Sequence, residues 1–154
     1  MDCGNLKPHL LKEYQNRWYV VGEVDNEFRV YGLDRIDNLE VLNNKPFKNK
    51  TEQANEKFYH AVGLNFSDYE PSKIILRFDL SQKRYLESLK LHHTQKEDPE
   101  NSIDGFYTIS LFVSYNFELK QQILKYGKFV EVIEPEFVRE DIKQELLKAI
   151  KNYT

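Results

Sequence analysis

The sequence is poor in the features that mark secreted and membrane proteins. It has one cysteine, Cys3, among 154 residues, which excludes an internal disulfide and is typical of a reducing compartment. No apolar run approaches the roughly 20 residues that span a bilayer. No basic segment followed by an apolar one marks a signal peptide at the N-terminus. These absences predict a cytoplasmic protein without a membrane partner.

The sequence has no excess of positive charge, with 22 Lys and Arg against 25 Asp and Glu. The formal net charge is -3, and residues 1–57 hold 9 Lys and Arg against 10 Asp and Glu. Neither half of the chain is a basic module, so the overall charge does not favour binding to duplex DNA. Hydrophobic residues make up 40% and aromatic residues 14% of the sequence, which suffices for a buried core. We therefore expect one ordinary domain or two small ones.

The first part of the chain has the pattern of short strands. Aromatic and β-branched residues are concentrated in 17–24, and apolar and polar residues alternate in 27–33. Turn-forming residues separate these two runs. The strands expected here are 9–14, 17–24, 27–33 and 39–42. Because tight turns join them, they favour a small antiparallel barrel or meander.

The second part alternates between strand and helix patterns. A polar stretch, 46–57, separates it from the first part as a linker, and a short helix is expected at 58–64. The strands expected beyond it are 73–79, 91–97, 106–115 and 129–133, and the helices are 81–89, 117–126 and 135–151. The resulting order, βαββαβ with a final helix, predicts a ferredoxin-like fold.

Two segments pair aromatic residues with arginines. The run Arg17-Trp18-Tyr19-Val20 is followed about ten residues later by Leu33-Asp34-Arg35-Ile36. Aromatic and arginine side chains on neighbouring strands form a surface that stacks on flat groups and binds anions. This pair of segments resembles the WYL domain of bacterial transcription regulators.

The resemblance extends over nearly the whole chain. The residues from about Tyr59 resemble the WCX extension that follows WYL domains, through Leu91-His92-His93-Thr94-Gln95 and the closing run 130–135. It implies an α+β protein: an incomplete Sm-like, SH3-type barrel in residues 1–45, the linker 46–57 and a ferredoxin-like WCX domain in residues 58–154. The barrel is expected to lack its first strand, which would leave an unpaired edge to be covered by a partner chain, by dimerisation or by residues near Met1.

Members of the family usually carry an N-terminal helix-turn-helix, and none precedes the WYL segment here. The chain is therefore expected to be a truncated regulator, a fragment of one or a stand-alone sensor. Sequence-specific binding of duplex DNA by this chain alone is not expected. A second departure is Gly32, at a position where many members have an arginine. The chain accordingly has one anion-binding side chain fewer.

The resemblance implies an effector site for a nucleotide, a single-stranded nucleic acid or another anionic molecule. Tyr19 is expected to stack on a base, Arg35 and Arg29 to hold phosphate, and His9 to add a hydrogen bond. Trp18 is included as a ligand contact. Without the resemblance, the sequence allows other roles for Trp18, the arginines and His9. Trp18 is a core residue by the usual behaviour of strand aromatics, the arginines are surface residues paired with nearby acids, and His9 faces solvent.

No enzymatic motif is present, since the sequence lacks a glycine-rich phosphate loop, a nucleophile elbow and HExxH. His92 and His93, on an expected strand, would point to opposite faces, so we expect no metal site and no cofactor. Two functions follow. The first is the effector-sensing portion of a WYL-type regulator that acts through a dimer. The alternative is a dimerisation or interaction module without a ligand.

Overall fold

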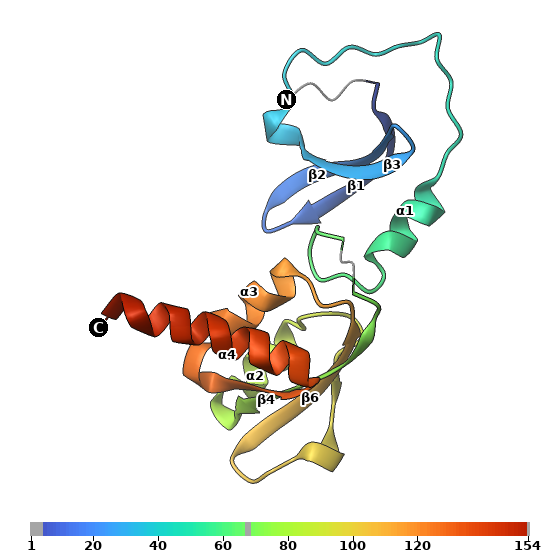
Figure 1. The fold of residues 1–154 in the computed structure, drawn as a ribbon. Coiled ribbons are helices and arrows are strands. Elements are labelled where there is room, and N and C mark those ends of the chain that lie inside the picture. Colours follow the sequence, from blue (N-terminus) through green and yellow to red (C-terminus); the bar gives the residue numbers. More distant parts are fainter. Residues whose placement is uncertain (1–4, 67–68, 154) are drawn as a thin grey trace. The chain divides into compact units, whose positions relative to one another are not determined.

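The computed structural model describes residues 5–66 and 69–153. Its contacts divide the chain into two units, Met1–Tyr59 and His60–Thr154. The first is a small β unit with one helix, and the second is a four-stranded sheet with helices (Figure 1). The chain is therefore an α+β protein, as the sequence predicts.

The first unit is built on a three-stranded antiparallel sheet of β1 (Lys7–Tyr14), β2 (Arg17–Val24) and β3 (Glu27–Gly32). Two residues connect each pair of strands, and all four connecting residues have positive φ, from 50° at Gln15 to 67° at Asn26. Such turns match the twist of a hairpin and favour Asn and Asp. The described residues form these three strands and no closed barrel.

A bulge in β1 shapes one end of this sheet. The register shifts between Pro8 and Leu10, which leaves His9 as the extra residue. Gly22 lies opposite Pro8, and a Cβ on Gly22 would stand 2.8 Å from the carbonyl oxygen of Lys7. Only glycine fits this close approach of the two backbones.

Helix α1 (Thr51–Phe58) completes the first unit. The side-chain oxygen of Asn49 accepts a hydrogen bond from the Thr51 amide at 2.8 Å, and Ala54 and Phe58 are buried. Most of this helix lies in the stretch 46–57 that was expected to be a linker. It forms because its two apolar residues, which are four positions apart, are buried on one side of the helix. The expected helix 58–64 was wrong, since the helical residues come earlier.

The expected strand 39–42 was also wrong. The structure has no strand there, and Leu39 and Val41 are 78% and 77% exposed. Four apolar-rich residues form a strand only where another strand supplies hydrogen bonds, and none of the described strands does so here.

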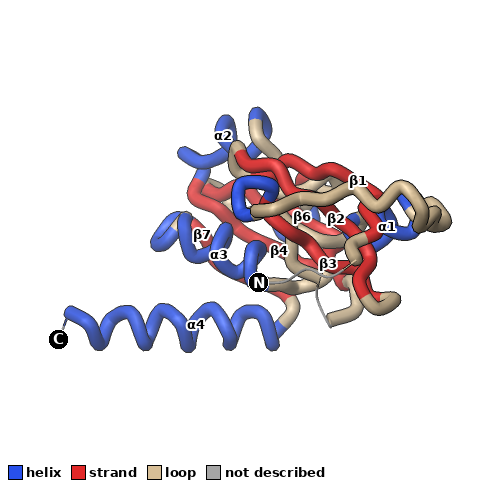
Figure 2. The backbone as a smooth tube through the Cα atoms, turned by 90° about the horizontal axis from the view of Figure 1, so that it is seen from above, coloured by secondary structure: helices blue, strands red, loops and turns tan. Residues whose placement is uncertain are grey.

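The second unit has four antiparallel strands in the order β5-β6-β4-β7. The chain passes through β4 (Ser72–Asp79), α2 (Lys83–Ser88), β5 (Lys96–Glu97), β6 (Phe106–Val113), α3 (Phe117–Lys125), β7 (Val130–Glu134) and α4 (Glu136–Ile150). Short 3-10 turns lie at 33–35, 80–82, 99–101, 127–129 and 151–153. This connection and strand order are those of a ferredoxin-like fold, as predicted. Helices α3 and α4 lie side by side (Figure 2).

The core of the second unit follows the expected alternation. Residues 107, 109, 111 and 113 of β6 are all buried, and they pack with Ile74, Leu76 and Phe78 of β4. The expected strand 91–97 is reduced to the two residues of β5. The reason is a turn at residues 91–95, where the Gln95 side chain accepts from the Leu91 amide and donates to the Leu86 carbonyl.

Candidate functional site

The aromatic and arginine segments meet at one edge of the first unit, around Gly32. Tyr19 of β2 pairs with Gly32 of β3. A Cβ on Gly32 would lie 3.7 Å from Tyr19 Cε1 and 3.9 Å from Arg35 Cδ. The tyrosine ring and the arginine stem therefore flank the same point, which the Asp34 carboxylate also approaches, at 2.7 Å. Tyr19 is half-buried and Arg35 is exposed.

Lys12 adds a second cation to this cluster. It is the cross-strand partner of Tyr19 on β1, so the two side chains lie on the same face of the sheet. Its ammonium group lies 4.8 Å from the centre of the Phe58 ring, and burial lowers the pKa of Lys12. The sequence analysis missed this residue, because only the strand register places it next to Tyr19.

The charges around Tyr19 differ in how they are paired. Arg17 and Asp34 form an ion pair at 3.9 Å. Within residues 5–66 and 69–153, neither Lys12 nor Arg35 has an ion pair with a carboxylate. We define Lys12, Tyr19 and Arg35 as the Tyr19 cluster, an aromatic residue with a lysine opposite it on β1 and an arginine stem near it.

Trp18 and Arg29 lie on the opposite face. Side chains alternate along β2, so Trp18 points away from the Tyr19 cluster. Trp18 is 52% exposed, so its interpretation as a core residue was wrong. Alternation shows that neighbouring residues face opposite ways, but it does not show which face is covered. Arg29 bonds to Glu27 at 3.4 Å, and hydrogen bonds to Tyr31 and Glu27 raise the pKa of its guanidinium.

His9 lies at the bulge and is half-buried rather than facing solvent. Its Nδ1 accepts a hydrogen bond from the Lys50 amide at 3.2 Å, and its ring packs edge-on against Phe28 and Phe47. Burial lowers the pKa of His9. Thr51 Oγ donates to the His9 carbonyl at 2.7 Å. His9 therefore connects β1 to the segment that leads into α1.

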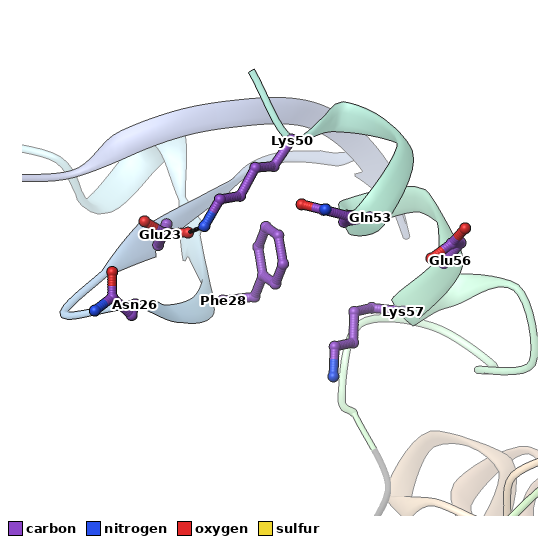
Figure 3. Close-up of a pocket in the computed structure, with 7 residues that line it drawn as sticks. All are labelled: Glu23, Asn26, Phe28, Lys50, Gln53, Glu56 and Lys57. Carbon is purple, nitrogen blue, oxygen red and sulfur yellow. Dashed lines mark hydrogen bonds and ion pairs between the residues drawn. The ribbon is translucent and has the colours of Figure 1, made fainter. Parts of the chain in front are cut away.

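A polar pocket of about 380 Å³ lies between β2, β3 and α1 (Figure 3). Glu23 is buried at its wall and forms ion pairs with Lys7, at 2.8 Å, and with Lys50. Hydrogen bonds from Lys50 and Lys7 lower the pKa of Glu23 to about 2. The pocket is lined by Glu23, Asn26, Phe28, Lys50, Gln53, Glu56 and Lys57. Sequence reasoning missed it, since its residues come from separate segments.

The adjacent histidines of the second unit lie in a turn, not on a strand as expected. The His92 and His93 rings are 4.0 Å apart, so they do not point to opposite faces. Among the described residues, no group of three or more His, Cys, Asp or Glu side chains could hold a metal ion. Within the same residues, no helix has both the length and the apolar character needed to cross a membrane.

Comparison with protein families places both units. Residues 5–41 match the model of the WYL domain, and residues 70–150, more than half of the chain, match the model of the WCX domain. The chain belongs to the WYL–WCX family. This confirms the resemblance predicted from the sequence, and it assigns the three-stranded unit to a regulatory WYL domain and the ferredoxin-like unit to WCX.

Among solved structures, the WYL–WCX chain is similar to the proteasome accessory factor B/C (PafBC) of Arthrobacter aurescens, at 20% sequence identity and a TM-score of 0.38. The match covers 89% of this chain and 21% of PafBC, so the chain spans about a fifth of that protein. No curated protein matches the chain.

Proposed function

We propose that this chain is the effector-sensing portion of a WYL-type transcription regulator, and that the Tyr19 cluster binds a nucleotide or a single-stranded nucleic acid. One observation supports this most directly: Tyr19 Cε1 and Arg35 Cδ both lie within 4 Å of the point where a Gly32 Cβ would stand, with Lys12 opposite Tyr19. The Asp34 carboxylate, 2.7 Å from that point, is paired with Arg17. The class of effector is inferred from the family, and the residues that bind it are inferred from the geometry.

Each residue of the cluster suits one part of such a ligand. The Tyr19 ring offers a flat face for a base, a contact that tolerates any base. The Arg35 guanidinium can hold a phosphate through two parallel hydrogen bonds, and no ion pair among the described residues has to break first. Lys12 adds a point charge. Arg29 and His9 are bonded to Glu27 and Lys50 and contribute less in this arrangement.

The response to the effector is proposed to be allosteric. Binding at the WYL domain would favour one arrangement of a homodimer, and the dimer would control a DNA-binding domain of the regulator. Neither half of this chain is basic, so we assign no sequence-specific duplex binding to it. The proposed setting is the bacterial cytoplasm. The function is one of binding rather than catalysis.

The test is fluorescence anisotropy of short labelled single-stranded DNA and RNA at two salt concentrations. We expect salt-sensitive binding that weakens about tenfold in Arg35→Ala and in Tyr19→Ala, as for the loss of one charged or stacking contact. Arg84→Ala, which removes an exposed arginine from α2, is the matched control and should bind as the unchanged chain does. Equal binding by all four proteins, or none at either salt concentration, would refute the proposed site.

A second function, an interaction module without a ligand, is favoured by the other face of the sheet. Leu11 and Trp18 are 57% and 52% exposed there. They lie on adjacent strands on one face, and exposed apolar pairs of this kind are typical of protein contacts. If this face mediates a dimer, the double variant Leu11→Ser and Trp18→Ser should be a monomer in light scattering. It should still bind the effector.

A further inference from the structure

A groove in the second unit lies apart from every residue discussed so far. It has a volume of about 660 Å³ and is formed where α2 and α3 end. Its lining residues are Gln82, Tyr85, Ser88, Leu89, Lys125, Tyr126, Gly127, Lys128 and Phe129. Ligand pockets for small molecules commonly have volumes of 300–1,000 Å³, so the groove is large enough for one.

Large apolar side chains line this groove and remain open to solvent. Tyr85 and Leu89 are 68% and 79% exposed, and Phe129 is 38% exposed. Tyr126 is held in place beneath them, since its ring packs edge-on against buried Phe78 at 4.9 Å. Two flat rings and a leucine gathered around one cavity provide a surface for a flat apolar body.

The charge of the groove has one sign. Lys125 and Lys128 line it, and no carboxylate does among the described residues. Glu87, on the same helix as Tyr85, is bound to Lys83 at 3.8 Å. The Lys128 ammonium lies 5.1 Å from the centre of the Phe129 ring, so charge and aromatic surface meet at one point. Asp79, outside the lining, is a carboxylate whose charge interacts with Lys128. In a chain of net charge -3, a lining that holds two lysines and no acid favours an anion.

We propose that this groove is a second ligand site, which binds a small organic anion with a flat aromatic body. The body lies against Tyr85, Leu89 and Phe129, and the carboxylate, sulfonate or phosphate group binds Lys125 and Lys128. The site is independent of the Tyr19 cluster, because all of its residues belong to the second unit.

Lys125 also has a structural role that the test must separate. It lies in the last turn of α3, where a positive charge stabilises the helix dipole. Lys128 follows the helix and has no such role. The decisive variant is therefore the pair Lys125→Ala and Lys128→Ala, with Lys128→Ala alone as the variant that spares the helix.

The probe is 8-anilinonaphthalene-1-sulfonate, a flat aromatic anion, with neutral N-phenyl-1-naphthylamine as its uncharged counterpart. In 1H–15N spectra of the full chain, we expect the sulfonate to shift the amide signals of Ser88, Leu89 and Gly127. The lysine pair variant should weaken its binding about fivefold, and Lys128→Ala about twofold, as for exposed charge contacts. Lys143→Ala with Lys148→Ala, an equal change of charge on α4, should leave it unchanged.

Other outcomes overturn the proposal. These are shifts that map to another surface, equal binding by the lysine pair variant, or equal affinity for the neutral probe. Displacement of the sulfonate by 1-naphthoate supports an aromatic carboxylate as the ligand, and displacement by adenosine monophosphate supports a nucleotide. Failure of both to displace it also overturns the proposal.

Discussion

The ammonium group of Lys50 forms an ion pair with the carboxylate of Glu23, which lies 27 residues earlier and is buried in the central strand of the first unit. Lys50 immediately precedes α1, and its amide also donates to His9. Through these two contacts Lys50 joins β1, β2 and the start of α1. The WYL unit is held together by this contact as well as by its small apolar core.

Stability of the first unit is expected to depend on pH through Glu23. Its pKa in the folded chain is about 2, below the ordinary value of 4.5. A lowered folded-state pKa contributes stability above about pH 4.5, and this contribution is lost as the pH falls towards 2. The difference in urea midpoint between the unchanged chain and Glu23→Gln should therefore be largest near pH 7 and shrink below pH 4. Fluorescence of Trp18, the only tryptophan, follows the unfolding. A difference that is constant with pH would contradict this.

Substitution of two glycines of the first unit by alanine should change its stability by very different amounts. Gly22→Ala places a Cβ 2.8 Å from the Lys7 carbonyl oxygen, so the backbone must move, at a cost of about 1–3 kcal/mol. Gly32→Ala has one tight contact, with the end of the Asp34 side chain, and its φ of -67° suits any residue. It should change stability by less than about 0.5 kcal/mol. Urea unfolding of both variants, read by Trp18 fluorescence, tests the pair. Equal effects would show that the bulge does not constrain Gly22.

Asn116 is expected to stabilise the second unit through both ends of its side chain. Its oxygen accepts from the Leu119 amide at the start of α3, and its nitrogen donates to the carbonyls of Val62 and Asn65 at 2.8 and 3.0 Å. Asn116→Ala should cost about 2–4 kcal/mol, since it removes a helix cap and leaves two carbonyls unsatisfied. Asn116→Ser keeps an oxygen that can cap the helix, without setting a carboxylate against the two carbonyls, and should cost less. Amide hydrogen exchange of core residues in β6 measures both, and equal losses would show that the cap carries no part of the effect.

Local sequence patterns correctly predicted the elements whose form depends mainly on their own residues. The strand Arg17–Val24 was predicted with its observed bounds, because an aromatic and β-branched run ends at turn residues on both sides. The buried face of β6 followed from alternation alone. Residues 39–42 had a similar composition, but none of the strands in residues 5–66 and 69–153 pairs with them. The difference lies in tertiary pairing, which a short window of sequence does not contain.

The candidate sites were less predictable than the fold. Tyr19 and Arg35 were selected through the family resemblance, and their proximity depends on the register of β2 and β3. Lys12 needed the register of a third strand. The pair of Glu23 and Lys50 depends on the path of an irregular segment, which no periodicity describes. The exposed face of Trp18 depends on what covers the sheet, and this too is a property of the whole unit.

The last prediction concerns the position where family members carry an arginine. Gly32→Arg should restore a cation between Tyr19 and Arg35, since the only close contact of its Cβ is the movable Asp34 carboxylate at 2.7 Å. For single-stranded DNA, one added phosphate contact steepens the dependence of log K on log salt by about 0.7. Anisotropy titrations at several salt concentrations measure that slope. Gly32→Gln adds a side chain without charge and should leave the slope unchanged. If Gly32→Arg also left the slope unchanged while Arg35→Ala reduced it, the arginine would not reach the phosphates that Arg35 holds.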